Sequence, residues 1–146
     1  MTGKYDHTMD TKGRVAVPSR LREALGSTFH VAIGASRDGR GQVCKYLVLY
    51  PDGVWQALEE KLNALPSNQA AQADVMLAYA AQCELDAQSR ILIPQNLRDY
   101  AELGKEVVIT GSSNKAKLWD KATWDRHSAP QLDPGQVADM FDLLGL

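Results

Sequence analysis

The 146-residue sequence has few of the features that would place it among membrane, secreted or metal-dependent proteins. No apolar run approaches the roughly 18 residues needed to span a bilayer. The first ten residues, MTGKYDHTMD, lack the apolar core of a secretory signal peptide. The cysteines, Cys44 and Cys83, are far apart and outside any metal-like spacing. We therefore expect reduced thiols and a cytoplasmic protein.

Signatures of enzymes are also scarce. His7, His30 and His127 are widely separated, and neither HExxH nor GxSxG occurs. The glycine-containing segment GASRDGRG lacks the Lys-Ser/Thr of a phosphate-binding P-loop. Cys44 lies in an apolar segment, where an inert buried thiol is expected. We expect no enzyme, cofactor, metal or small-molecule substrate, although a site assembled only in three dimensions would leave no such motif.

Charge is distributed unevenly along the chain. The formal net charge is −2, yet residues 1–50 hold eight Lys or Arg against four Asp or Glu. Residues 51–146 hold eight against fourteen. An acidic balance normally counts against nucleic-acid binding, but one basic end suffices to attract phosphate. Composition alone leaves both readings open.

An internal repeat is the most informative feature. The stretches DTKGRVAVPSRLR (10–22) and DAQSRILIPQNLR (86–98) share Asp, Arg, Pro, Leu and Arg at a constant offset of 76 residues. Between the Arg and the Pro, both place three apolar residues. Such a repeat decides the architecture. We expect two half-units of ββ-α-ββ-α form. A half-unit of about 65 residues buries little surface on its own, so we expect the two halves to share one core.

Hydrophobic periodicity predicts the elements of the first copy. Alternation around an Asp10–Gly13 turn predicts a hairpin over 4–18, followed by a short helix over 19–25. Pro18 can open that helix because its missing N–H is harmless there. Two strands, 29–35 and 44–51, are expected on either side of a Gly- and Arg-rich loop, 36–42. Helices are expected over 51–66 and 68–82.

The second copy is expected to follow the same order. The predictions are a hairpin over 83–94, a helix over 95–101, strands over 105–111 and 115–120, and a helix from 121. Tyr50 and Trp55 match Trp119 and Trp124 at an offset of 69, so the first copy carries seven extra residues. We place these in the 36–42 loop. A tail helix is expected to carry an apolar side made of Val137, Met140, Phe141 and Leu144.

The segments YDHTMDTKGRVAVPSRLR and ELDAQSRILIPQNLRDYAELGKEVV resemble the MraZ family, bacterial regulators built from tandem AbrB-like (SpoVT-AbrB) domains. The resemblance covers nearly the whole chain and is least diagnostic over 34–42 and after about residue 128. It implies an α+β, β-rich fold in which two swapped-hairpin-type repeats form an intrachain pseudo-dimer, double-split β-barrel-like, with flanking helices. The expected parts are the repeats 1–53 and 82–127, a helical link 54–81 and a tail 128–146.

The resemblance also implies a function. Members of the family are DNA-binding transcription factors of the nucleoid that act on the promoter of the division and cell-wall gene cluster, which includes their own gene. Their chains assemble into rings, which present basic faces to short direct repeats in double-stranded DNA. Helical stripes in this chain would also suit an oligomeric protein-interaction module without DNA contact, although such stripes more often form core or self-association faces.

Basic residues around the first predicted turn are the candidates for DNA contact. A turn tip places Lys12 and Arg14 in solvent, where arginine can grip a guanine edge and lysine acts as a point charge. The alternative is that they are solvated charges, or that Arg14 pairs with Asp10. With the repeat and the family included, DNA contact is favoured, with Arg90 assisting. The predicted DNA-binding set is Lys4, Lys12, Arg14, Arg20, Arg22 and Arg90.

Asp10, Gly13, Asp86 and Ser89 are predicted to set the geometry of the two turns. Glycine adopts positive φ freely, whereas Ser89 at the matching position would be strained by about 1 kcal/mol. Either Ser89 tolerates that strain or the second turn has another geometry. The second copy also has Ala87-Gln88-Ser89 in place of Thr11-Lys12-Gly13, with one charge fewer.

Arg22 and Arg98 follow their prolines by four residues in both copies. Burial against carboxylates of the other half would make them structural. We favour a structural role for Arg98 and leave Arg22 undecided.

Overall fold

A computed structural model describes residues 1–38 and 40–146. No helix in this part of the chain is long and apolar enough to cross a membrane. The elements, in chain order, are β1 Lys4–Thr8, β2 Arg14–Ala16, α1 Ser19–Leu25, β3 Thr28–Arg37, β4 Val43–Pro51, α2 Asp52–Asn63, α3 Ser67–Ala78, β5 Ala81–Glu84, β6 Arg90–Leu92, α4 Gln95–Tyr100, β7 Glu106–Ser112, β8 Lys115–Asp120, α5 Lys121–Gln131 and α6 Pro134–Leu144.

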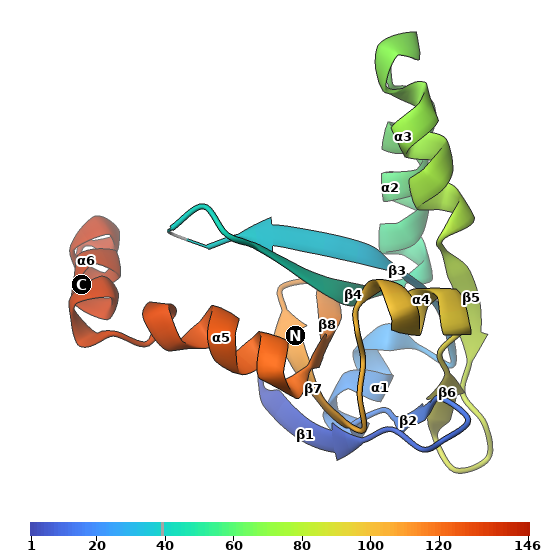
Figure 1. The fold of residues 1–146 in the computed structure, drawn as a ribbon, viewed down its shortest axis with the longest axis horizontal. Helices are drawn as coiled ribbons and strands as arrows, with labels where there is room; N and C mark the ends of the chain where they lie inside the picture. The colour runs from blue at the N-terminus through green and yellow to red at the C-terminus, as the bar shows by residue number, and fades with distance from the viewer. Residues whose placement is uncertain (39) are drawn as a thin grey trace.

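Strands of the two copies are interleaved in one antiparallel sheet. Its order is β1-β7-β8-β4-β3-β5, and β2 and β6 form a separate two-stranded ribbon (Figure 1). Exchanging every strand for its counterpart in the other copy (β1 for β5, β2 for β6, β3 for β7, β4 for β8) gives the same order from the opposite edge. The chain is therefore an intrachain pseudo-dimer, which confirms the predicted α+β class with two swapped repeats.

The strands on either side of each turn do not pair with each other. β1 pairs with β7 of the second copy, β5 pairs with β3 of the first, and β2 pairs with β6. The hairpins predicted over 4–18 and 83–94 are therefore wrong as strand pairings, although a turn forms in each. Alternation identifies a strand by its buried face and contains no information about its partner.

The pseudo-twofold axis passes through the centre of the sheet. On the β4–β8 ladder, Leu47 lies opposite Leu118 and Leu49 lies opposite Ala116. Residues 69 apart in the chain exchange places across this ladder, as expected if the axis lies between the two strands. The offset found from Tyr50 and Trp119 in the sequence therefore describes the symmetry of the fold.

Alternation along the central strands divides the core between the two faces of the sheet. On one face, Leu47 and Leu118 are fully buried and belong to the same cluster as Ile91 from the β2–β6 ribbon. On the other face, Val48 and Trp119 form a second cluster with side chains of α5 packed against it. The first cluster draws on both copies, so the two halves share one core, as their small size requires.

The first copy differs from the second by a longer β3–β4 hairpin, and it is followed by the helix α3, which has no counterpart between the second copy and α6. β3 and β4 have 10 and 9 residues against 7 and 6 in β7 and β8, and their pairing reaches Arg37 opposite Val43. The seven extra residues therefore lie largely in a longer hairpin, not in the loop predicted over 36–42; Gly39 of that loop is outside the described residues. α3 packs against α2 and ends at Ala78, so the helix predicted over 68–82 extends too far.

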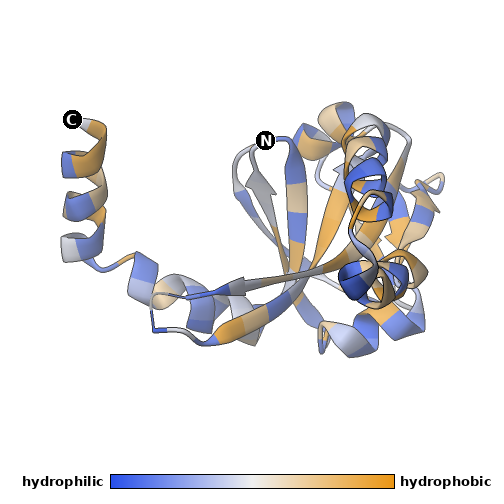
Figure 2. Ribbon diagram, turned by 90° about the horizontal axis from the view of Figure 1, so that it is seen from above, coloured by the Kyte–Doolittle hydropathy of each residue, from blue (hydrophilic) through white to orange (hydrophobic). Residues whose placement is uncertain are grey.

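α6 lies away from the body of the molecule (Figure 2). The predicted apolar side forms, with Val137 40%, Met140 53%, Phe141 52% and Leu144 62% exposed. Asp133 caps the helix by accepting hydrogen bonds from the backbone N–H groups of Gly135 and Gln136. A capped amphipathic helix thus presents its apolar side to solvent in the single chain.

Candidate nucleic-acid interface

The two equivalent turns, 10–13 and 86–89, lie at opposite ends of the short antiparallel β2–β6 ribbon. The ribbon is short, so both turns lie at one end of the molecule (Figure 1). Each is bonded to the opposite copy. Ile93 N donates to Gly13 O at 2.9 Å, and Val17 N donates to Ser89 O at 3.0 Å. These two bonds are related by the pseudo-twofold axis, so the swapped topology brings both turns to one surface.

The first turn is organised by Asp10. Its Oδ1 accepts hydrogen bonds from the backbone N–H groups of Lys12 at 3.0 Å and Arg14 at 2.8 Å. Its Oδ2 accepts from Arg14 Nε at 2.6 Å. Gly13 N donates to Asp10 O at 3.0 Å, with Gly13 at φ +87°. One carboxylate therefore shapes the backbone and holds the base of the Arg14 guanidinium.

The second turn has the same geometry. Asp86 Oδ1 accepts from the backbone N–H groups of Gln88 at 2.9 Å and Arg90 at 2.8 Å, and Oδ2 accepts from Arg90 Nε at 3.0 Å. Ser89 N donates to Asp86 O at 3.0 Å, and Ser89 has φ +60°. Of the two alternatives left open above, Ser89 thus takes the left-handed conformation, and a different second turn is excluded.

Hydrogen bonding keeps both turn aspartates ionised. The Arg14 backbone N–H, followed by the Arg14 side chain, lowers the pKa of Asp10 to about 2. The Arg90 backbone N–H is the main cause of the lowered pKa of Asp86. Since each carboxylate takes only Nε of its arginine, the outer edges of both guanidinium groups remain available for other acceptors.

Arg14 and Arg90 lie close together across the ribbon. The side chains are 35% and 30% exposed, and Arg90 Nη1 lies 3.9 Å from Asp10 Oδ2. The pairing of Arg14 with Asp10 considered from the sequence is therefore present, and it leaves the guanidinium partly solvated. Two arginines and two aspartates form one cluster, in which the aspartates orient the arginines.

The other predicted contacts lie in different places. Lys12 is exposed at the tip of the first turn, and Arg20 is exposed on α1. Lys4 begins β1, at the end of that strand remote from the turn, and its Nζ lies 3.0 Å from Asp6 Oδ1. The structure therefore does not bring Lys4 together with the turns.

Arg22 and Arg98 each lie against the turn of the opposite copy. Arg22 Nη1 donates to Ser89 Oγ. The Arg98 guanidinium packs on Gly13, where an added Cβ would lie 2.6 Å from Arg98 Cζ. Within the described residues neither arginine forms an ion pair with a carboxylate. Both arginines contact the turn of the other copy, and not the carboxylates considered from the sequence.

One basic residue near the first turn was missed. Lys105 is exposed, its backbone O accepts from Met9 N at 2.8 Å, and it lines a hollow of about 590 Å³ with Thr11 and Arg98. The equivalent bond in the other copy joins Leu85 N to Ser27 O, so Lys105 has no charged counterpart. Only the pairing of β1 with β7 places it here, and no local pattern signals it.

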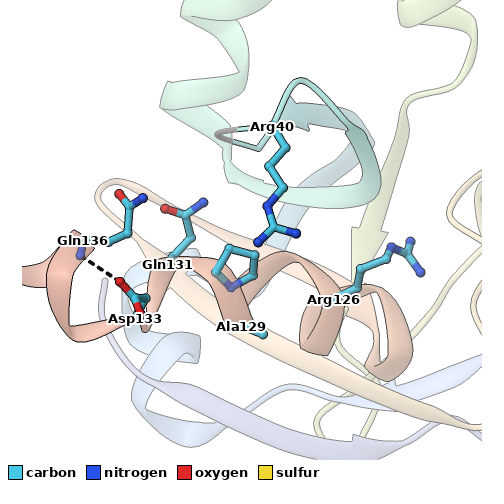
Figure 3. A pocket seen from close by; sticks show the side chains of 7 residues that line it. Arg40, Arg126, Ala129, Gln131, Asp133 and Gln136 are labelled. Carbon is cyan, nitrogen blue, oxygen red and sulfur yellow. Dashed lines mark hydrogen bonds between the residues drawn. The ribbon is translucent and has the colours of Figure 1, made fainter.

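A second hollow lies far from the turns. It has a volume of about 680 Å³, lies where the end of the β3–β4 hairpin meets α5 and α6, and is lined by Arg40, Arg126 and Pro130 among others (Figure 3). In the described part of the chain, no three His, Cys, Asp or Glu side chains gather as a metal site. Burial raises the pKa of the Cys83 thiol to about 11, so it is protonated at neutral pH.

Comparison with known proteins finds similarity to one family along nearly the whole chain. The sequence profile of a family described as MraZ protein and as antitoxin-like matches residues 1–75 and 76–135. A transcriptional regulator MraZ from Lachnoclostridium phytofermentans is 41% identical over 146 residues, 99% of this chain and 96% of the relative. Those from Carboxydothermus hydrogenoformans and Desulfitobacterium hafniense are 44% and 46% identical over 128 and 129 residues, each 86% of this chain. These alignments span 84% and 85% of the lengths of the two relatives.

Proposed function

This chain belongs to the MraZ family of transcriptional regulators, and on that premise we propose that it binds specific DNA sequences through its paired turns. Its targets are short direct repeats in the promoter of the bacterial division and cell-wall gene cluster, including its own promoter. It binds them as a ring of identical chains in the cytoplasm, at the nucleoid. MraZ is a family of regulators and not of enzymes.

The observation that carries this proposal is the joint presentation of both turns on one surface. Arg14 and Arg90 are held by carboxylates with their outer edges partly solvated, and Lys12 stands at the tip of the first turn. Preset guanidinium groups suit base edges or phosphates, since little side-chain freedom is lost on binding. Exposed lysine adds phosphate contact without sequence information.

Charge is not equal at the two turns, and this supports binding in one orientation. The position of Lys12 is taken by Gln88 in the second copy, and the position of Lys105 is taken by Ser27 in the first. The pseudo-twofold backbone alone would suit a palindrome, but the extra lysines distinguish one half from the other. In a head-to-tail ring, neighbouring chains have the same orientation and so match direct repeats.

The small number of basic residues per chain supports a multivalent mode. Affinity for DNA scales with the number of phosphates neutralised, so a single chain is a weak ligand. Linking several chains in a ring raises the effective concentration of each further contact. Occupancy of the promoter would then alter access of the polymerase.

The test is fluorescence anisotropy with DNA from upstream of the protein's own gene and a scrambled duplex, across a salt series. Wild type is expected to prefer the promoter and to weaken steeply with salt, and Arg14→Ala is expected to lose that preference. Arg126→Ala, an exposed arginine on α5 away from the turns, is the matched control. Full promoter affinity in an assembled Arg14→Ala protein contradicts the assigned contact.

A second candidate function is supported by α6. Its exposed apolar side would suit an oligomeric module that recruits another protein without touching DNA. If assembled wild type binds neither duplex at low salt, this function replaces the first.

A further inference from the structure

The contact between Arg98 and Gly13 joins a helix of the second copy to the DNA-facing turn of the first. Arg98 is in the last turn of α4, beside the buried Leu97. Its guanidinium occupies the space in which a Cβ of Gly13 would stand, 2.6 Å from Cζ and 2.7 Å from Nε. Residue 13 is therefore a glycine for two reasons: its φ is positive, and a side chain there would clash with the guanidinium.

The same segment of the second copy also holds the turn backbone. Ile93 N, five residues before Arg98, donates to Gly13 O at 2.9 Å. Gly13 is thus held through its carbonyl by Ile93, which directly follows β6, and against its Cα by the guanidinium. Its neighbours Lys12 and Arg14 are the proposed DNA contacts. Their direction depends on the orientation of the peptide units on both sides of Gly13.

The pseudo-symmetric contact shows the same device with different chemistry. Val17 N donates to Ser89 O at 3.0 Å, and Arg22 Nη1 donates to Ser89 Oγ. In the described residues, Nε of both Arg22 and Arg98 is buried without a hydrogen-bond partner. Leaving a buried donor unpaired is costly. Because neither guanidinium has a full set of polar partners, packing against the turns is what positions both groups.

We propose that Arg98 is a positioning residue for DNA binding: its guanidinium, packed on Gly13, holds the Lys12–Arg14 turn of the opposite repeat in its binding geometry. Arg22 does the same for the Gln88–Arg90 turn. This inference rests on the proposed DNA-binding function. It assigns to Arg98 a role through shape, so a residue of equal charge without the planar group does not replace it.

The test compares Arg98→Lys, Arg98→Ala and wild type by anisotropy on the promoter duplex across a salt series. Arg98→Lys keeps the charge, so a direct phosphate contact would survive in it. We expect both variants to lose affinity by a similar factor of about ten, within the usual range for coupling between sites, and to have the same salt slope as each other. Arg126→Lys, exposed on α5, is the matched control and is expected to bind as wild type.

A double-mutant cycle tests the contact without DNA. Gly13→Ala, Arg98→Ala and the double variant are compared by urea unfolding. The shift in midpoint caused by Gly13→Ala is expected to be smaller in the Arg98→Ala background, because the clash with the guanidinium is gone and only the φ strain remains. Additive shifts would show that the two residues do not interact and would overturn the proposal. If Arg98→Ala does not fold, Arg98→Lys takes its place in the cycle.

The remaining outcomes separate the two claims. Wild-type affinity in Arg98→Lys, or a salt slope lower in Arg98→Ala than in Arg98→Lys by about 0.9 per bound chain, makes Arg98 a direct phosphate contact and overturns its positioning role. Absence of DNA binding by wild type overturns the proposed function, and the DNA role of Arg98 with it. In that case the unfolding cycle still shows whether Arg98 holds the turn.

Discussion

Val48 and Lys117 occupy the same position in the two repeats, and they pair with each other on the β4–β8 ladder. A residue lies opposite its own counterpart only where a twofold axis passes. The two repeats of one chain therefore meet as two subunits of a dimer would, and everything on either side of this pair is built from both copies.

The two repeats are expected to unfold together. Leu47 and Leu118 face each other across the axis, both at 0% exposure. Truncating either to Ala removes a buried side chain and leaves a cavity, at a cost of about 2–5 kcal/mol. Urea unfolding followed by circular dichroism and by tryptophan fluorescence should give one coincident transition for each variant. Separate transitions for the two signals would contradict a shared core.

Lys12 and its counterpart Gln88 are expected to differ in DNA binding. Lys12→Ala should weaken binding to the promoter and to the scrambled duplex alike, and reduce the salt slope by about 0.9 per bound chain. Gln88→Ala, the matched change at the other turn, should leave the slope unchanged, because no charge is lost. Equal slopes for Lys12→Ala and wild type would remove Lys12 from the interface.

Exchanging the residues at the two left-handed positions should have unequal effects. Gly13→Ser adds a Cβ at φ +87° and against Arg98, so it should destabilise the fold by more than about 1 kcal/mol. Ser89→Gly relieves strain of about 1 kcal/mol but loses the hydrogen bond from Arg22, which contributes about 0.5–1.5 kcal/mol. It should therefore be near neutral. Thermal unfolding of both variants measures the difference, and equal shifts would contradict it.

The turn aspartates should make stability depend on acid pH. The pKa of Asp10 is lowered from 3.8 to about 2 in the folded protein, mainly by the Arg14 backbone N–H. Its contribution to stability is therefore complete above about pH 4 and is lost as the pH falls through about 2. Urea midpoints of wild type should fall across this window, and those of Asp10→Asn should fall less. Parallel curves would show that Asp10 does not gain hydrogen bonds on folding.

The two phenylalanines should differ sharply in their importance for stability. Phe29 is 0% exposed and Phe141, on α6, is 52% exposed. Phe29→Ala should cost about 3–5 kcal/mol, whereas Phe141→Ala should change the unfolding free energy by no more than about 0.5 kcal/mol. Urea unfolding at low protein concentration makes the comparison. A large loss from Phe141→Ala would mean that the apolar side of α6 is covered in the folded protein.

Much of this architecture could be predicted because the signals are local. Period-two alternation around residues 15 and 91 identified strands, and Asp10 with Gly13 identified a turn. The repeat offsets of 76 and 69 identified the two copies and their matching aromatic residues. Strand partners could not be predicted in this way, since alternation is the same whichever strand lies alongside. That is why the local hairpins were wrong while the swapped pseudo-dimer, implied by the family resemblance, was confirmed.

The sequence by itself determined the two copies, the turn chemistry of Asp10 and Asp86, and the asymmetry between Lys12 and Gln88. These depend on residue type and on spacing over a few positions. Tertiary structure alone decided that Arg98 lies on Gly13, that Arg22 bonds Ser89 and that Lys105 stands beside the first turn. Each of these contacts crosses between the copies, because β2 pairs with β6 and β1 with β7. Contacts between distant segments depend on strand pairing, which is set by the packing of the whole core.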